Sequence, residues 1–299
     1  MNKIFILFVL IALTINGCTS LKFEPIVQKT FPDLRFCMQS SEKGEFLQTD
    51  NAEKVKFQVD SKSLYWNDTP IFFNTAPQKI VKNESFLFFE YSQNYLSFSN
   101  FAFVEALLNP NKCRKNIQVI VLDAGHGGKD PGAVGKKSLE KDLNLNIVLA
   151  LKSYLEGQGK RVYLTRSSDE YLALSERIDI VKSLPEKVDL FISIHQNAST
   201  NPQANGVEIY FPAKIFENSN VREDDKFNFL LACDIQNNLT KNLKVKNRGV
   251  KFANFYVLKN NPIPAVLIEC GFISNLQEEE IISSPEYISK FIESLAKVL

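Results

Sequence analysis

The chain of 299 residues contains only two histidines, His126 and His195, and each follows a run of apolar residues. Residues 119–122 read Val-Ile-Val-Leu before the small residues that lead to His126, and residues 189–195 end on His195. Such runs are typical of strands buried on both faces of a parallel sheet. Ligands of these sheets bind outside the carboxyl ends of the strands, so we expect both imidazoles at the reactive edge. For either histidine considered alone, the alternative is an ordinary turn after a core strand.

Two glutamates could complete a site. Glu269 ends a third apolar run, residues 265–269, and Glu140 stands where a helix is predicted to start. Two histidines and one carboxylate form the ligand set of a catalytic zinc ion, which leaves a fourth position for water. A carboxylate at the same edge could accept a proton from that water and pass it to a leaving amine. Taken singly, each glutamate could instead form an ion pair or cap a helix, but two histidines at equivalent strand ends favour a site.

The elements that must position these groups alternate between helix and strand. Apolar residues recur at helical spacing in residues 142–155 and 172–181, and residues 161–166 have the texture of a strand. This alternation indicates parallel βαβ units. Residues 285–299 place their apolar side chains on one face, which predicts a docked helix. The charged segment 213–231 is predicted to be a solvated loop.

Short motifs follow one another through the second part of the chain and carry a family resemblance. They are L-D-A-G-H-G-G (122–128), L-T-R (164–166), L-S-E-R (174–177), S-I-H-Q-N-A (193–198), G-V-E-I-Y-F (206–211), R-G-V-K (248–251) and P-A-V-L-I-E-C-G-F (264–272). Together with Glu140, this order resembles the zinc-dependent N-acetylmuramoyl-L-alanine amidases of the Amidase_3 family, over residues 119–299. The resemblance implies a doubly wound α/β fold with a mostly parallel sheet and flanking helices.

Carried over residue by residue, the resemblance places one zinc ion on His126, Glu140 and His195 and the catalytic role on Glu269. It implies hydrolysis of the amide bond between the lactyl group of N-acetylmuramic acid and the L-alanine of the peptidoglycan stem peptide, for cell-wall remodelling or cell separation. Two alternatives remain: a zinc peptidase of the same fold that cuts within the stem peptide, and a lipoprotein that binds peptidoglycan without cleaving it.

Further polar residues of the motifs could bind substrate or support the site. Asn197 is expected to orient the site or bind substrate. Arg248 could pair with a carboxylate of the stem peptide, or form a structural ion pair instead. Arg166 and Arg177 are assigned to internal salt bridges.

The amino terminus has the features of an export signal, residues 1–17. A short basic start precedes an apolar run at residues 4–15, which is too short for a membrane span of ~20 residues. The sequence Ile-Asn-Gly-Cys at 15–18 resembles the lipobox of bacterial lipoproteins, although Asn16 departs from the small residue usual there, and a plain signal is the alternative. We therefore expect an exported protein of the cell envelope, on the periplasmic side, anchored to a membrane by lipid on Cys18.

Between the signal and the catalytic domain, residues 18–30 are expected to form a tether and residues 31–115 a small β-rich domain of unknown role. The catalytic domain is expected to cover residues 116–299. A net charge of +1 gives no indication of a nucleic-acid partner; the expected substrate is peptidoglycan, and an activator protein remains open. Cys37 and Cys113 could pair, whereas Cys233 and Cys270 stand in apolar contexts typical of buried thiols.

Overall fold

The computed structural model describes residues 115–212 and 223–299, together with eight strands between Phe36 and Ser97 for which only the backbone is described. The predicted export signal, Cys18, the tether and Cys113 lie outside the described residues. Among the residues that are described, no helix is long and apolar enough to cross a membrane.

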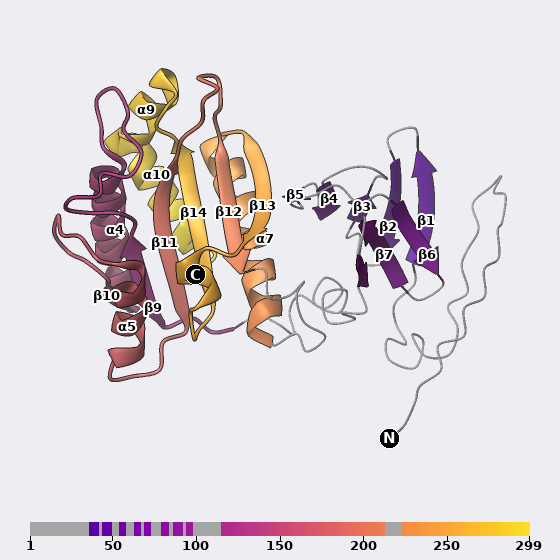
Figure 1. Cartoon of the computed structure of the whole chain (residues 1–299), viewed down its shortest axis with the longest axis horizontal. Helices are drawn as coiled ribbons and strands as arrows, with labels where there is room; N and C mark the ends of the chain where they lie inside the picture. The colour runs from indigo at the N-terminus through magenta and orange to yellow at the C-terminus, as the bar shows by residue number, and fades with distance from the viewer. Residues whose placement is uncertain are drawn as a thin grey trace.

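The second part of the chain forms a six-stranded sheet with the order β13-β12-β14-β11-β9-β10 (Figure 1). The strands are β9 (Val119–Ala124), β10 (Arg161–Leu164), β11 (Leu190–Asn197), β12 (Val207–Pro212), β13 (Asn247–Ala253) and β14 (Ala265–Phe272). Neighbours run parallel except β12 and β14, which are antiparallel. The predicted mostly parallel α/β sheet is therefore confirmed.

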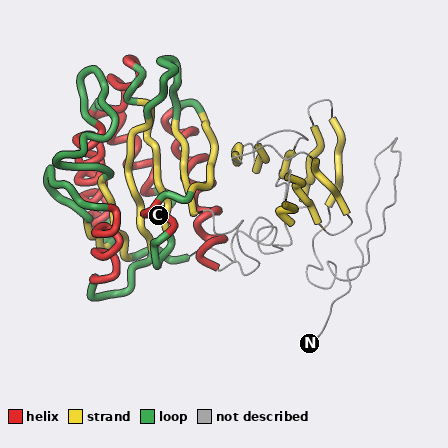
Figure 2. Tube along the Cα trace, viewed as in Figure 1, coloured by secondary structure: helices red, strands yellow, loops and turns green. Residues whose placement is uncertain are grey.

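Helices cover both faces of this sheet, as expected for a doubly wound fold (Figure 2). One face packs against α4 (Glu140–Gly157), α7 (Glu223–Leu243) and α10 (Pro285–Ala296), and the other against α5 (Leu174–Ser183) and α8 (Tyr256–Lys259). The short helix α9 (Leu276–Ile282) follows β14. The apolar runs form the central strands because side chains on both faces are buried between these helix layers. The predicted carboxyl-terminal helix is docked, with Phe291 and Leu295 fully buried.

The region before residue 115 contributes two groups of strands. The strands β1 (Phe36–Ser41), β2 (Gly44–Thr49), β3 (Lys54–Phe57), β4 (Ser63–Trp66) and β5 (Thr69–Phe72) pair in antiparallel order. The last of them, β5, lies parallel to the edge strand β13 and so extends the main sheet. The strands β6 (Lys79–Asn83), β7 (Phe86–Tyr91) and β8 (Asn94–Ser97) form a separate antiparallel sheet.

One predicted loop is partly wrong. The helix α7 begins at Glu223, and Phe227 and Phe229 are buried, whereas the whole of residues 213–231 was expected to be solvated. The first turn of α7 is rich in charged residues, so its composition resembles that of a solvated loop. The apolar residues that follow it were therefore not assigned to a helix. Residues 213–222 lie outside the described part of the chain. The expected buried thiols are confirmed, because Cys233 and Cys270 are buried and unpaired.

A buried ion pair supports the end of β9 below the site. Asp123 accepts hydrogen bonds from Arg177 Nη1 at 2.7 Å, Thr165 Oγ1 at 2.6 Å and Ser193 Oγ at 2.7 Å. Burial by itself would raise the pKa of Asp123, but Arg177 and the two hydroxyls together lower it below its usual value. The internal salt bridge predicted for Arg177 is confirmed. Arg166 is different, since its guanidinium donates to main-chain carbonyls rather than to an acid.

Replacing Asp123 by asparagine should lower the free energy of unfolding by about 3 kcal/mol, because the buried Arg177 guanidinium loses its anionic partner. Urea denaturation at neutral pH measures this change. Glu286→Gln, which removes an exposed ion pair with Lys290, is the control and should leave the midpoint nearly unchanged. Equal stability of the Asp123 variant and the unchanged chain would contradict the prediction.

The same substitution should also change the response to acid. Because the folded-state pKa of Asp123 is lowered, its contribution is present above the unfolded pKa of about 3.9 and is lost as the pH falls through the folded value. The unchanged chain should therefore lose more stability than Asp123→Asn as the pH falls below about 4.

Candidate metal and catalytic site

Three side chains converge at the carboxyl edge of the sheet. His126 follows β9, His195 lies near the end of β11, and Glu140 is the first residue of α4. Glu140 Oε1 lies 2.9 Å from His195 Nδ1 and 3.3 Å from His126 Nε2. The two imidazole rings are 5.0 Å apart and nearly perpendicular, at 79°. One donor atom from each residue can therefore reach a common point, since these atoms lie within 4.8 Å of one another.

The loop after β9 fixes the orientation of His126. Its φ of 62° is in the left-handed region, which turns the chain sharply out of the strand. Asp130 Oδ2 lies 2.8 Å from His126 Nδ1, so the opposite nitrogen faces Glu140. A carboxylate in this position is the usual outer partner of a metal-binding imidazole. Arg166 and Arg177 hold the same loop by donating to the carbonyls of residues 124–126.

Glu140 is almost fully buried and yet well supplied with donors. Its Oε2 accepts from Ala133 N at 2.8 Å, and its Oε1 accepts from Gln196 N at 3.1 Å as well as facing the two histidines. Burial would raise the pKa of this carboxyl, but the hydrogen bonds and charge of His126 and His195 outweigh it and hold the pKa well below its usual value. Glu140 therefore remains a carboxylate.

The ring of His195, on β11, lies against the main chain of Gly125, which follows the neighbouring strand β9. A Cβ atom at position 125 would collide with the His195 imidazole, so glycine is required there for the ring to enter the site. The motif G-H-G-G thus provides one ligand candidate and the space for the other.

The arrangement fits a metal ion. Two imidazoles and one ionised carboxylate converge from three different elements, and this donor set is that of a catalytic zinc site with a position left for water. The Asp130 carboxylate behind His126 adds the outer hydrogen bond that such a site requires. His126, Glu140 and His195 could therefore hold a metal.

Glu269 lies directly beside this group. It is the register partner of His195 in the adjacent strand β14. Its Oε2 is enclosed and has no hydrogen-bond partner among the described residues. Burial raises the pKa of Glu269, the negative charges of Glu140 and Glu208 raise it further, and Lys251 opposes them. A carboxyl with a raised pKa and a free oxygen suits a group that must gain and lose a proton.

A second buried carboxylate, Glu208, was not identified from the sequence. It lies on β12 opposite Glu269, and its two oxygens accept from four side chains. The donors are Asn197 Nδ2 at 2.5 Å, Tyr210 Oη at 2.9 Å, Arg248 Nε at 2.9 Å and Lys251 Nζ. Burial would raise the pKa of Glu208, but Lys251, Arg248 and Tyr210 lower it overall. A lone glutamate inside the apolar run of β12 was the available signal.

The two residues predicted to contact substrate both bind this carboxylate. Asn197 donates to Glu208, and Arg248 forms an ion pair with it while lying 4.6 Å from the centre of the Phe272 ring. The structural ion pair considered for Arg248 is therefore present. Its side chain keeps 27% of its surface exposed, so it also faces solvent beside the site.

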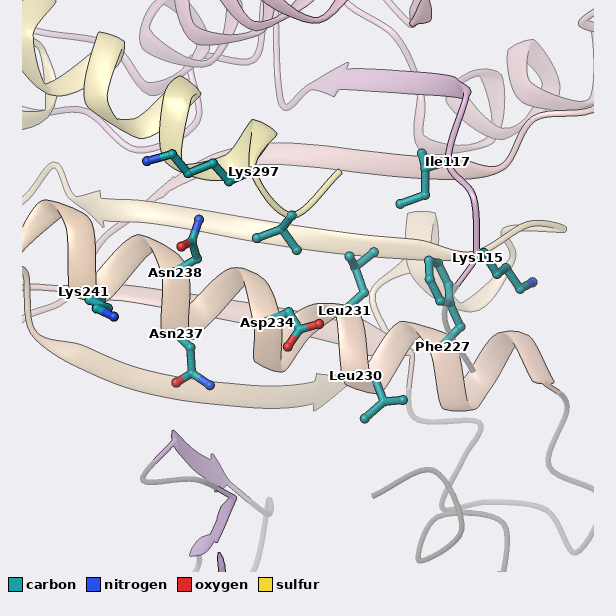
Figure 3. Close-up of a pocket in the computed structure, with 11 residues that line it drawn as sticks. Lys115, Ile117, Phe227, Leu230, Leu231, Asp234, Asn237, Asn238, Lys241 and Lys297 are labelled. Carbon is teal, nitrogen blue, oxygen red and sulfur yellow. The ribbon is translucent and has the colours of Figure 1, made fainter. Parts of the chain in front are cut away.

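A pocket of about 340 Å³ lies elsewhere, along α7 (Figure 3). Its apolar lining includes Phe227, Leu230 and Leu231 of α7 together with Ile117 and Val298. It shares no residue with the group around Glu140, so the site at the sheet edge is the candidate for chemistry.

The second part of the chain is similar in sequence to curated bacterial proteins. The chain is 38% identical over 178 residues to the uncharacterized protein YqiI of Bacillus subtilis, covering 60% of this chain and 81% of that one. It is 35% identical to the N-acetylmuramoyl-L-alanine amidase LytC of Bacillus subtilis, covering 60% of this chain. Only 34% of LytC is matched, so the chain spans about a third of that relative.

Solved structures share the fold of the same region. The catalytic domain of CwlV, an N-acetylmuramoyl-L-alanine amidase from Bacillus (Paenibacillus) polymyxa, is 33% identical with a TM-score of 0.54, covering 61% of this chain and 96% of that one. The CwlD amidase from Clostridioides difficile, solved in complex with the GerS lipoprotein, is 34% identical with a TM-score of 0.53, covering 60% and 94%.

The family model described as N-acetylmuramoyl-L-alanine amidase matches residues 120–299, which run from the second residue of β9 through β14 and include the convergent histidines and glutamates. This match covers more than half of the sequence. The chain therefore belongs to the N-acetylmuramoyl-L-alanine amidase family Amidase_3.

Proposed function

We propose that the chain hydrolyses the amide bond between the lactyl group of N-acetylmuramic acid and L-alanine of the peptidoglycan stem peptide. The observation that carries the proposal is the convergence of His126, Glu140 and His195 next to a glutamate, Glu269, with an unpaired oxygen. Family membership supports the bond, and the donor set supports one zinc ion as the metal.

His126, Glu140 and His195 would hold the zinc ion. When bound, zinc supplies Lewis-acid polarisation of the amide carbonyl and lowers the pKa of its water toward ~7. Glu269 accepts the proton of the attacking water through its free Oε2. It then returns this proton to the nitrogen of the leaving L-alanine, so that the amide and water become a lactyl carboxylic acid and a free amine.

Glu208 and Glu269 have different partners and therefore different roles. Four donors saturate Glu208 and lower its pKa, so it keeps its charge and cannot readily take up a proton. Glu269 has a raised pKa and an oxygen with no hydrogen-bond partner in the described part of the chain, which suits proton transfer. Asn197 and Arg248, held on Glu208 beside Glu269, are proposed to position the substrate.

The remaining parts of the proposal concern the cell envelope. Residues 1–17 would direct export, Cys18 would carry the lipid anchor on the periplasmic side, and residues 18–30 would tether the domains that follow. An activator protein is part of the proposal, because CwlD, a relative of known structure, was solved in complex with a lipoprotein.

Digestion of purified peptidoglycan by the full chain should release stem peptides that begin with L-alanine, as read by mass spectrometry. A zinc chelator should stop the release and added zinc should restore it, because the amide carbonyl is no longer polarised when the metal is removed. Cleavage within the stem peptide would indicate a peptidase instead. Binding to the wall without any release would indicate a non-catalytic wall-binding protein.

Glu269→Gln should keep one zinc ion per chain and lose activity by at least about 100-fold, because the amide side chain cannot accept the proton of water. Zinc content and the rate of peptide release measure the two effects separately. Glu280→Gln, which changes an exposed carboxylate paired with Lys137, is the matched control and should remain active. A fully active Glu269 variant would remove this residue from the mechanism.

A further inference from the structure

A tight hairpin leads into Glu140. Ala133 and Glu140 are joined by two hydrogen bonds, from Glu140 N to Ala133 O at 3.0 Å and from Ala133 N to Glu140 Oε2 at 2.8 Å. Val134 and Leu139 pair above them, and Gly135 N donates to Ser138 O at 3.0 Å. The side chain of Glu140 is therefore fixed to the base of the hairpin, and any shift of the hairpin moves this carboxylate.

The tip of the hairpin is held by another glutamate, Glu279 of α9. Its carboxylate accepts from three successive main-chain N–H groups: Lys136 N at 3.1 Å, Lys137 N at 2.7 Å and Ser138 N at 2.8 Å. Figure 1 shows α9 beside the loop that precedes α4. Glu279 is 1% exposed, and among the described residues its carboxylate has no ion-pair partner. The three N–H groups thus provide the stabilisation that a buried charge requires.

The hairpin has a space for this carboxylate. A Cβ atom at Gly135 would collide with Glu279 Oε1, so glycine lets the carboxylate approach the main chain closely. The helix α9 follows directly after β14, the strand that carries Glu269. The contact of Glu279 therefore joins α9, the helix after the strand that carries Glu269, to the hairpin that ends at the proposed metal ligand Glu140.

We propose that Glu279 is a positioning residue of the metal site: its clamp on residues 136–138 holds Glu140 where it meets His126 and His195. The inference rests on the proposed function, because it needs these three residues to bind zinc. A merely structural Glu279 would stabilise the fold without any particular effect on the metal.

The test is the affinity of the full chain for zinc, measured by competition with a chromophoric chelator. Glu279→Gln should weaken zinc binding by about tenfold, the lower end of the effect of removing a group that orients a metal ligand. In the metal-free protein, hydrogen exchange should show faster exchange of the amides of Lys136, Lys137 and Ser138, because their acceptor is weakened.

Two neighbouring glutamates of α9 are matched controls. Glu280→Gln removes an exposed ion pair to Lys137 of the same hairpin and should leave zinc affinity within about twofold. Glu278→Gln changes a buried carboxylate that accepts from Gly206 N at 2.7 Å and Phe272 N at 2.9 Å, both outside the hairpin. It should reduce thermal stability without a matching loss of zinc affinity.

Gly135→Ala should also weaken zinc binding, because the added methyl group displaces the Glu279 carboxylate without changing its charge. The inference is overturned if Glu279→Gln and Gly135→Ala bind zinc as tightly as Glu280→Gln, or if Glu278→Gln loses affinity equally. Absence of zinc binding by the unchanged chain would instead refute the metal site of the proposed function, and the inference with it.

Discussion

The site depends on one constraint, which is that the Glu140 carboxylate must remain ionised while it is buried between two imidazoles. Removing a carboxylate from water costs several kcal/mol unless donors replace the water. Here Gln196 N and Ala133 N donate to the carboxylate, and His126 and His195 face it from two further segments of the chain. The left-handed turn at His126 and the space left by Gly125 bring the two imidazoles to the same carboxylate.

The other carboxylates at this edge differ in what surrounds them, and the surroundings decide what each can do. Glu208 and Glu279 have their oxygens occupied by several donors, so they act as fixed charges that hold side chains or a hairpin in place. Glu269 has a raised pKa and an enclosed oxygen that no described residue contacts by a hydrogen bond, and this combination suits proton transfer. Environments that separate the pKa values of neighbouring acids are the usual way to assign acid and base roles.

The main sheet and the meeting of His126, His195 and Glu269 followed from the sequence, because apolar runs predict central strands and parallel strands end at one edge. Glu140 needed the family resemblance, since a glutamate at a helix start is commonly a cap. Glu208 and Glu279 were not predicted because their donors are far away in the sequence. Arg248 donates to Glu208, and the main chain of residues 136–138 donates to Glu279. The start of α7 was missed because its first turn is charged, and the contacts of Arg166 are with carbonyls that carry no sequence signal.

The most direct measurement is anomalous diffraction at the zinc edge from crystals of the zinc-loaded full chain. One strong peak is expected at about 2.0–2.2 Å from a nitrogen of His126, a nitrogen of His195 and an oxygen of Glu140. A peak bound by other residues, or no peak at this edge in protein that binds zinc stoichiometrically, would contradict the account.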